Sequence, residues 1–190
     1  MPEGPEIETD GLRETIYEPP SGTLLRKIAL TTALFAALGA VAALRAGGTV
    51  NEALVLKTEA TRLQAEASDQ WAYYQAKGIK AAVQESLRTT WTAAGKPVPL
   101  EVEKKIQQYA ADQKEIDKAA REKERERDEK STEADHLMER HHRYANSVAL
   151  IQVSIALAAV AALTRQRLIW MASILLGLAG AALFVVTSAR

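Results

Sequence analysis

Cysteine is missing from this chain of 190 residues, which excludes disulfide bonds, zinc sites with thiolate ligands and catalysis by a thiol. A surplus of one charge is missing too, because 24 basic side chains balance 24 acidic ones. Bulk charge therefore gives no reason to expect a nucleic-acid partner. The sequence also has no P-loop, dinucleotide fingerprint or nucleophile elbow. We therefore expect a protein that is not an enzyme and has no catalytic residues, no cofactor and no metal site.

Proline is scarce and unevenly placed. Four of the prolines lie in residues 1–20, where acidic side chains also gather, so residues 1–25 are expected to form a disordered acidic tail. The remaining prolines are Pro97 and Pro99, just after Gly95. Such a group interrupts a helix, and residues 93–99 are predicted to form a turn. The helix-patterned arms on either side of this turn are expected to fold back on each other, giving a helical hairpin over residues 49–146.

Long apolar runs are what the chain does contain. Uncharged runs occupy residues 28–44, 148–163 and 168–186. A membrane-spanning helix needs about 20 apolar residues. We therefore predict transmembrane helices at residues 26–46, 148–164 and 168–187, with the lipid bilayer as a partner. Small residues at every fourth position, which let membrane helices pack closely, recur in all three spans: Thr32, Ala36 and Ala40; Ser154, Ala158 and Ala162; Ser173, Gly177 and Ala181.

The end of the first span carries two glycines, Gly47 and Gly48, which are expected to loosen the helix. Thr49 and Glu52 then have the spacing of a capping box, in which the Thr side chain caps a helix and the Glu reaches back to it. A new helix is therefore predicted to begin close to Thr49.

Apolar periodicity describes how the two arms pair. The returning arm follows a heptad repeat, whose period of 3.5 residues is typical of a coiled coil. Its positions are Val102, Ile106, Tyr109, Gln113, Ile116, Ala120, Lys123, Arg127, Lys130, Ala134, Leu137, His141 and Tyr144. The outgoing arm has an apolar face at Ala53, Leu56, Ala60, Leu63, Ala67, Trp71 and Tyr74, which we expect to continue through Ile79, Val83, Leu87 and Trp91. The fold class is therefore all-α: three transmembrane helices with a long antiparallel, coiled-coil-like hairpin between the first and second.

A family resemblance enters with the stretch Asp69–Lys80, read as DQWAYYQAKGIK, together with Asn51–Ala53, Leu150–Val153 and Leu163–Trp170. These residues resemble the signature of a bacterial membrane-protein family known only as domain of unknown function 4337. The resemblance covers most of residues 25–188. It implies a bacterial protein with three spans and a helical insert, and it implies no activity.

The signature is also the densest group of aromatic and amide side chains. We take it as a candidate interaction surface for a partner or ligand, formed by Asp69, Gln70, Trp71, Tyr73, Tyr74, Lys77 and Lys80. The alternative is an aromatic layer that locks the arms, or neighbouring protomers, together. Asp135, Glu139 and His142 share a helical face, but the histidine spacing is not that of a metal site.

Basic residues crowd the ends of the first span and the short loop at residues 165–167. By the positive-inside rule we place the N-terminus in the cytoplasm and the hairpin in the periplasm, across the bacterial inner membrane. We expect a non-enzymatic scaffold or interaction protein that forms homo-oligomers or binds an unknown protein partner. The alternative is a subunit or accessory of a membrane channel or transporter.

Overall fold

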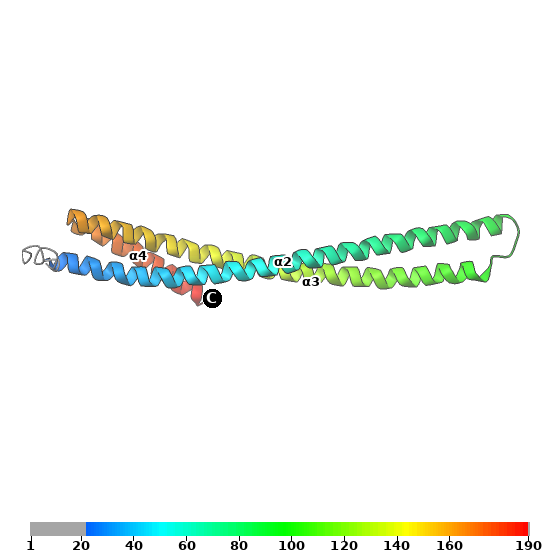
Figure 1. Cartoon of the computed structure of the whole chain (residues 1–190), viewed down its shortest axis with the longest axis horizontal. Helices are drawn as coiled ribbons and strands as arrows, with labels where there is room; N and C mark the ends of the chain where they lie inside the picture. The colour runs from blue at the N-terminus through cyan, green and yellow to red at the C-terminus, as the bar shows by residue number, and fades with distance from the viewer. Residues whose placement is uncertain (1–21, 190) are drawn as a thin grey trace, which may run out of the picture. The chain divides into compact units, whose positions relative to one another are not determined.

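A computed structural model describes residues 22–189, which form three helices and no strand (Figure 1). They are α2, Thr23–Ala93; α3, Leu100–Thr164; and α4, Arg167–Ser188. The expected all-α class is confirmed over this range. Of the expected tail, residues 1–21 lie outside the described part of the chain, and residues 23–25 belong to α2.

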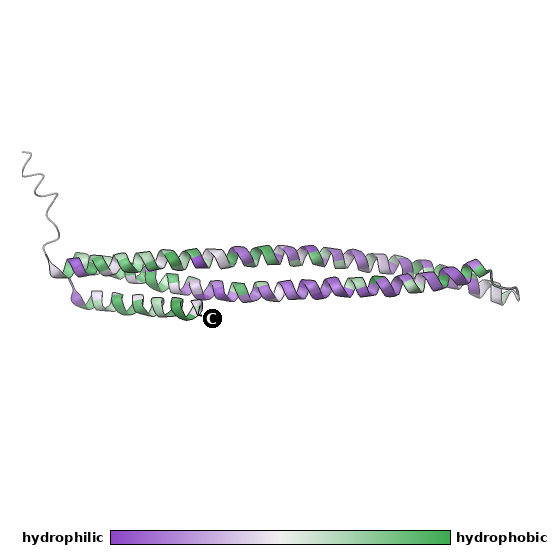
Figure 2. Ribbon diagram, turned by 90° about the horizontal axis from the view of Figure 1, so that it is seen from below, coloured by the Kyte–Doolittle hydropathy of each residue, from purple (hydrophilic) through white to green (hydrophobic). Residues whose placement is uncertain are grey.

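Each helix contains a stretch that is long and apolar enough to cross a membrane. Figure 2 shows α4 coloured as hydrophobic along most of its length, whereas much of α3 is hydrophilic. The chain divides into two compact units. The first contains the described residues up to Gly47 and those from Arg140 onwards, and the second is Gly48–Glu139.

The segment between α2 and α3 contains the residues expected to turn. Gly95 has a φ of 65°, a left-handed conformation that glycine adopts without strain. The Gly95 amide donates to the Thr92 carbonyl at 3.0 Å, and the Lys96 amide donates to the Trp91 carbonyl at 3.1 Å. This pair of bonds is a Schellman motif, which satisfies carbonyl groups at the end of α2. Pro99 then precedes the first residue of α3.

The predicted new helix near Thr49 is wrong, because α2 is continuous through Gly47, Gly48 and Thr49. Neither glycine has a positive φ, and a Cβ on either would meet nothing within 4 Å. Two helical glycines cost about 1 kcal/mol each relative to alanine. That cost does not end α2, which is helical on both sides of the two glycines.

Replacing Gly47 and Gly48 together with alanine is expected to stabilise the protein by about 2 kcal/mol, from helix propensity alone. Unfolding by denaturant, followed by circular dichroism, measures the change. Gly95→Ala is the matched control, and it should destabilise by about 1 kcal/mol because its φ is positive. A loss of stability in the double alanine variant would show that the glycines are needed as glycines.

Glycines bring helices together in the first unit. A Cβ on Gly39 would lie 3.0 Å from Ile151 Cγ2, and one on Gly180 would lie 2.8 Å from Ile151 Cγ1. A Cβ on Gly177 would collide with the ring of Phe35. Close approach at these glycines therefore joins α3 to both α2 and α4, and α2 to α4.

The expected rows of small residues are correct in part. Ser154, Ala158, Ser173 and Gly177 are buried. On α2, however, Ala36 and Ala40 are exposed, and the buried small residues are Gly39, Ala42 and Ala46. A row of every fourth residue drifts around a helix of 3.6 residues per turn, so a straight contact face must mix steps of three and four.

In the second unit, burial along α3 follows the predicted heptads. Val102, Ile116, Ala120 and Ala134 are buried. The heptad positions between and beside them, from Ile106 to Leu137, are all half-buried. The repeat therefore identifies the face of α3 that other residues cover.

On α2, the buried face follows the same 3.5-residue period along the whole second unit. Its positions are Ala53, Leu56, Ala60, Leu63, Ala67, Gln70, Tyr74, Lys77, Ala81, Gln84 and Arg88, all of them buried or half-buried. The expected continuation through Ile79, Val83, Leu87 and Trp91 is wrong, because these side chains are exposed. They recur at steps of four, so they rotate away from a face that repeats every 3.5 residues.

Contacts between α2 and α3 in this unit run in opposite directions along the chain. Lys57 Nζ lies 2.8 Å from Asp135 Oδ1, and Lys77 Nζ lies 2.7 Å from Asp112 Oδ2. As residue numbers rise along α2, the numbers of the contacted residues fall along α3. The two helices lie side by side over this part of the chain in Figures 1 and 2.

Candidate interaction surface

The signature residues Asp69–Lys80 lie on α2 in the second unit, and the structure divides the seven candidates between two faces. Gln70, Trp71, Tyr74 and Lys77 are half-buried. Asp69, Tyr73 and Lys80 are exposed. Only the second group is available to a partner without disturbing the contact with α3.

Lys77 is held at the centre of a cluster that joins the two helices. Its ammonium donates to Asp112 Oδ2 at 2.7 Å. It also lies 5.2 Å from the ring centroid of Tyr73 and 5.4 Å from that of Tyr109, within the range of a cation–π interaction. The hydrogen bond to Asp112, aided by Tyr73, raises the pKa of Lys77 above its ordinary value. The lysine is therefore charged at any physiological pH and serves as a cationic bridge between α2 and α3.

Trp71 makes a second bridge to α3. Its indole Nε1 donates to Glu124 Oε1 at 2.9 Å, and its ring meets the edge of Tyr74 with centroids 5.6 Å apart. The guanidinium of Arg121 lies 5.7 Å from the Trp71 ring. A hydrogen bond from Arg121 to Asp117 fixes this guanidinium and raises the pKa of Arg121. One tryptophan thus contacts two side chains of α3.

Gly78 lies against the side chain of Gln113 on α3. A Cβ there would lie only 2.9 Å from Gln113 Nε2. That same amide nitrogen donates to the Tyr74 carbonyl oxygen at 3.4 Å. The absence of a side chain at Gly78 leaves the room that Gln113 occupies.

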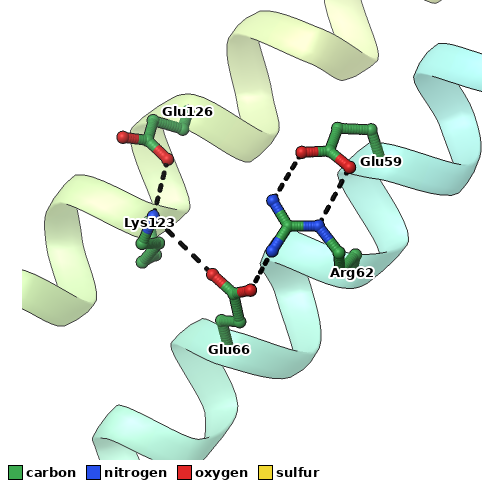
Figure 3. Close-up of polar contacts among 5 residues, drawn as sticks. All are labelled: Glu59, Arg62, Glu66, Lys123 and Glu126. Carbon is green, nitrogen blue, oxygen red and sulfur yellow. Dashed lines mark hydrogen bonds and ion pairs between the residues drawn. The ribbon is translucent and has the colours of Figure 1, made fainter.

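A group of charged residues precedes the signature on α2 and faces the charged middle of α3 (Figure 3). Arg62 Nε donates to Glu59 Oε2 at 2.9 Å, and Arg62 also pairs with Glu66 one turn later. Lys123 lies 3.0 Å from Glu126 on its own helix and 3.6 Å from Glu66 on the other. Glu66 therefore forms ion pairs with both helices.

These charges perturb one another's titration. The hydrogen bond from Arg62 lowers the pKa of Glu59 and raises that of Arg62. The hydrogen bond to Glu126, with help from Glu66, raises the pKa of Lys123. Because the side chains are largely solvent-accessible, such pairs add little stability. Of these pairs, only Lys123 with Glu66 joins the two helices, so it is the one that depends on the register of α2 against α3.

We call the polar contacts that join α2 to α3 the polar lock: Lys77 with Asp112, Trp71 with Glu124 and Arg121, and Gln113 with the Tyr74 carbonyl. Its partners on α3, Asp112, Glu124 and Arg121, were not among the residues expected to form the site. A signal for them was available: if the arms fold back about residues 93–99, Asp112 falls close to Lys77 and Glu124 close to Trp71. The heptad pattern included polar positions such as Gln113 and Lys123, but it gave no indication that Asp112, Glu124 and Arg121 would contact α2.

The histidines make no metal cluster. Within residues 22–189, no group of three or more His, Asp or Glu side chains could hold a metal ion. His141 Nδ1 lies 2.9 Å from the Ala46 carbonyl oxygen in the first unit, where it can donate a hydrogen bond. In the second unit Asp135 pairs with Lys57.

Lys77→Met is expected to lower the thermal midpoint of unfolding by a few degrees, because Asp112 loses its cation and the two tyrosine rings lose theirs. Lys80→Met is the matched control on the same helix, where the exposed ammonium should leave the midpoint nearly unchanged. Differential scanning fluorimetry in one detergent compares the two. Equal effects of both substitutions would contradict the role given to Lys77.

Comparison with known proteins gives one match. The family described as "Domain of unknown function (DUF4337)" matches residues 24–189. No curated protein and no solved structure matches the chain.

Proposed function

The chain belongs to the family described as domain of unknown function (DUF4337), and from this membership and the geometry of α2 and α3 we propose that it is a multi-pass membrane protein acting as a non-enzymatic scaffold. In this proposal the three apolar stretches cross the bilayer. Residues 48–139 form an antiparallel, coiled-coil-like hairpin outside it, which associates with other copies or with a protein partner.

Three features of the second unit support the hairpin. Burial repeats every 3.5 residues on both helices, as in a coiled coil. The contacted residue numbers fall along α3 as they rise along α2. A Schellman motif ends α2 just before the turn. Each is what two helices joined by a short connection need in order to pack side by side.

The observation that carries the proposal is that inward-facing side chains of the signature contact α3. Lys77 and Trp71, the most polar and the largest of its inward side chains, make their contacts with Asp112, Glu124 and Arg121 of α3. Side chains that hold two helices together indicate a structural role. None of these groups is placed as a nucleophile beside a base. We therefore favour a structural role for the hairpin.

Flux across reconstituted vesicles tests this function. A scaffold should leave the permeability of liposomes to ions and small solutes at the level of protein-free liposomes. A subunit that forms a conducting path would raise it, in which case the scaffold proposal fails. A channel or transport subunit is the alternative that this result would support.

Membrane orientation is a separate prediction. Arg26, Lys27, Arg165 and Arg167 lie on one side of the proposed spans, so the positive-inside rule places that side and the N-terminus in the cytoplasm. Because the chain has no other cysteine, Gly95→Cys should react in intact bacterial cells with a membrane-impermeant maleimide. Gln166→Cys should react only after lysis. The reverse pattern would place the hairpin in the cytoplasm.

A further inference from the structure

Four large apolar side chains remain exposed on α2 near the turn, and we call them the tip stripe: Ile79, Val83, Leu87 and Trp91. Their exposed fractions are 68%, 53%, 43% and 37%. Steps of four residues keep them within about 120° around a helix of 3.6 residues per turn. They therefore form one continuous face and not four scattered positions.

The second unit leaves the tip stripe partly open, most at Ile79 and least at Trp91. The face of α2 that is buried there runs through Lys77, Ala81, Gln84 and Arg88, on a different side of the helix. Isolated exposed apolar residues are normal, but a continuous apolar row on a surface marks an interaction site. The row is available for a partner because the polar lock has given the inward positions to charged and amide side chains.

We propose that the tip stripe binds the tip stripe of a second copy of this chain, with the two α2 helices parallel and related by a two-fold axis. This inference rests on the proposed function, because it requires both copies to be anchored in one membrane. It names the surface through which the scaffold associates with itself.

The charges beside the stripe fit a second copy. Lys80 lies along one edge of the stripe, while the other edge is uncharged and contains Ala82, Ser86 and Thr90. In a parallel two-fold pair each edge meets the opposite edge of the partner. The cationic edge of one copy therefore meets the neutral edge of the other, and no like charges are brought together.

The position of the stripe along α2 also fits a second copy. Because α2 is one continuous helix, every copy carries the stripe at the same number of residues from its first apolar stretch. Copies that share a bilayer and an orientation therefore present the same residues to each other. Confinement to a membrane raises their effective concentration, so a narrow apolar contact is sufficient.

Towards the membrane the stripe continues as the exposed small residues Ala72 and Ala76. Small side chains let two helix backbones approach closely, and the large side chains of the tip stripe can pack against each other nearer the turn. The α2 face thus offers a continuous contact on both sides of Ile79.

Single cysteines in the otherwise cysteine-free chain test the pairing. Full-length Val83→Cys, reconstituted in liposomes at a high lipid-to-protein ratio and oxidised with copper–phenanthroline, should form an interchain disulfide. Lys114→Cys, exposed on α3, is the control and should form little. Adding Leu87→Glu to Val83→Cys should abolish the disulfide, because it places two carboxylates in the contact.

A zero-length carbodiimide cross-link between Lys77 and Asp112 in the same samples distinguishes failure of the stripe proposal from failure of the hairpin proposal. If this link forms within one chain but Val83→Cys dimerises no better than Lys114→Cys, the stripe proposal is overturned and the hairpin scaffold stands. If Val83→Cys resists maleimide without dimerising, another partner covers the stripe, and the proposal of a second copy is again overturned. If the link between Lys77 and Asp112 is absent, the proposed hairpin itself fails.

Discussion

Replacing Gly180 with leucine is expected to destabilise the first unit by about 3 kcal/mol or more, the upper end for overpacking a tight contact. A Cβ at this position would lie 2.8 Å from Ile151 Cγ1, 3.1 Å from Leu150 Cβ and 3.1 Å from the Ser147 carbonyl oxygen. A side chain can move aside, but a backbone carbonyl of α3 cannot move without shifting the helix. The leucine therefore has to push α4 away from α3.

That separation also breaks a buried hydrogen bond. Ser147 Oγ donates to the Gly180 carbonyl at 2.8 Å, and Ser147 is fully buried. Ala179→Leu is the matched control, because Ala179 is the preceding residue and is exposed. Unfolding by sodium dodecyl sulfate in mixed micelles, followed by circular dichroism, measures both variants. Equal stability of the Gly180 and Ala179 variants would contradict the packing of α4 on α3.

Ala67→Glu is expected to cost about 3 kcal/mol or more in the second unit, because it buries a carboxylate without a partner. Ala67 is fully buried in the 3.5-residue repeat of α2, between the buried Leu63 and the half-buried Tyr74. Lys123, which forms an ion pair with Glu66 next to Ala67 in the sequence, already pairs with Glu126 as well. The new carboxylate of the Ala67→Glu variant would therefore have no cation of its own.

Ala65→Glu provides the control two residues away. Ala65 is exposed, so the same substitution there should change the unfolding free energy by less than about 0.5 kcal/mol. Limited proteolysis with trypsin reports on the second unit specifically, because most of the lysines and arginines lie there. If the Ala67 variant resists trypsin as well as the Ala65 variant does, Ala67 does not face α3.

The sequence predicts the buried face of α3 better than the buried face of α2, and the reason is physical. On α3 the large apolar residues Val102 and Ile116 occur at the same 3.5-residue repeat as the small ones, so pattern and packing agree. On α2 the largest apolar residues after Tyr74 recur every four residues. Hydrophobicity alone then favours Ile79 and Val83, whereas packing against a heptad-repeating partner favours Lys77 and Ala81.

The predicted break near Gly47 failed for a different reason. Helix-starting signals such as Thr49 and Glu52 indicate where a helix could begin, but they do not end the helix that precedes them. Among residues 22–189, only the turn at 93–99 combines a glycine at positive φ with two prolines, and α2 ends there. Local signals therefore located the turn, whereas the cost of two helical glycines, about 1 kcal/mol each, was too small to end the helix.

The sequence singled out residues 69–80 for their aromatic and amide side chains, and that they form an interaction surface stays a prediction. The contacts that these side chains make with α3 did not follow from the pattern. Whether Trp71 faces a partner or α3 depends on Glu124, which is 53 residues away in the sequence, and on Arg121 three residues before it. That choice follows from the register of two helices, which no local pattern contains.

Carbodiimide cross-linking of the native protein tests the pairing of α2 with α3 most directly. An equal mixture of unlabelled and ¹⁵N-labelled chains is reconstituted, cross-linked and digested, and the joined peptides are identified by mass spectrometry. We predict links between Lys77 and Asp112 and between Lys57 and Asp135, with both peptides of each link carrying the same isotope. Absence of these links, or links that join labelled to unlabelled peptides, would contradict a hairpin formed within one chain.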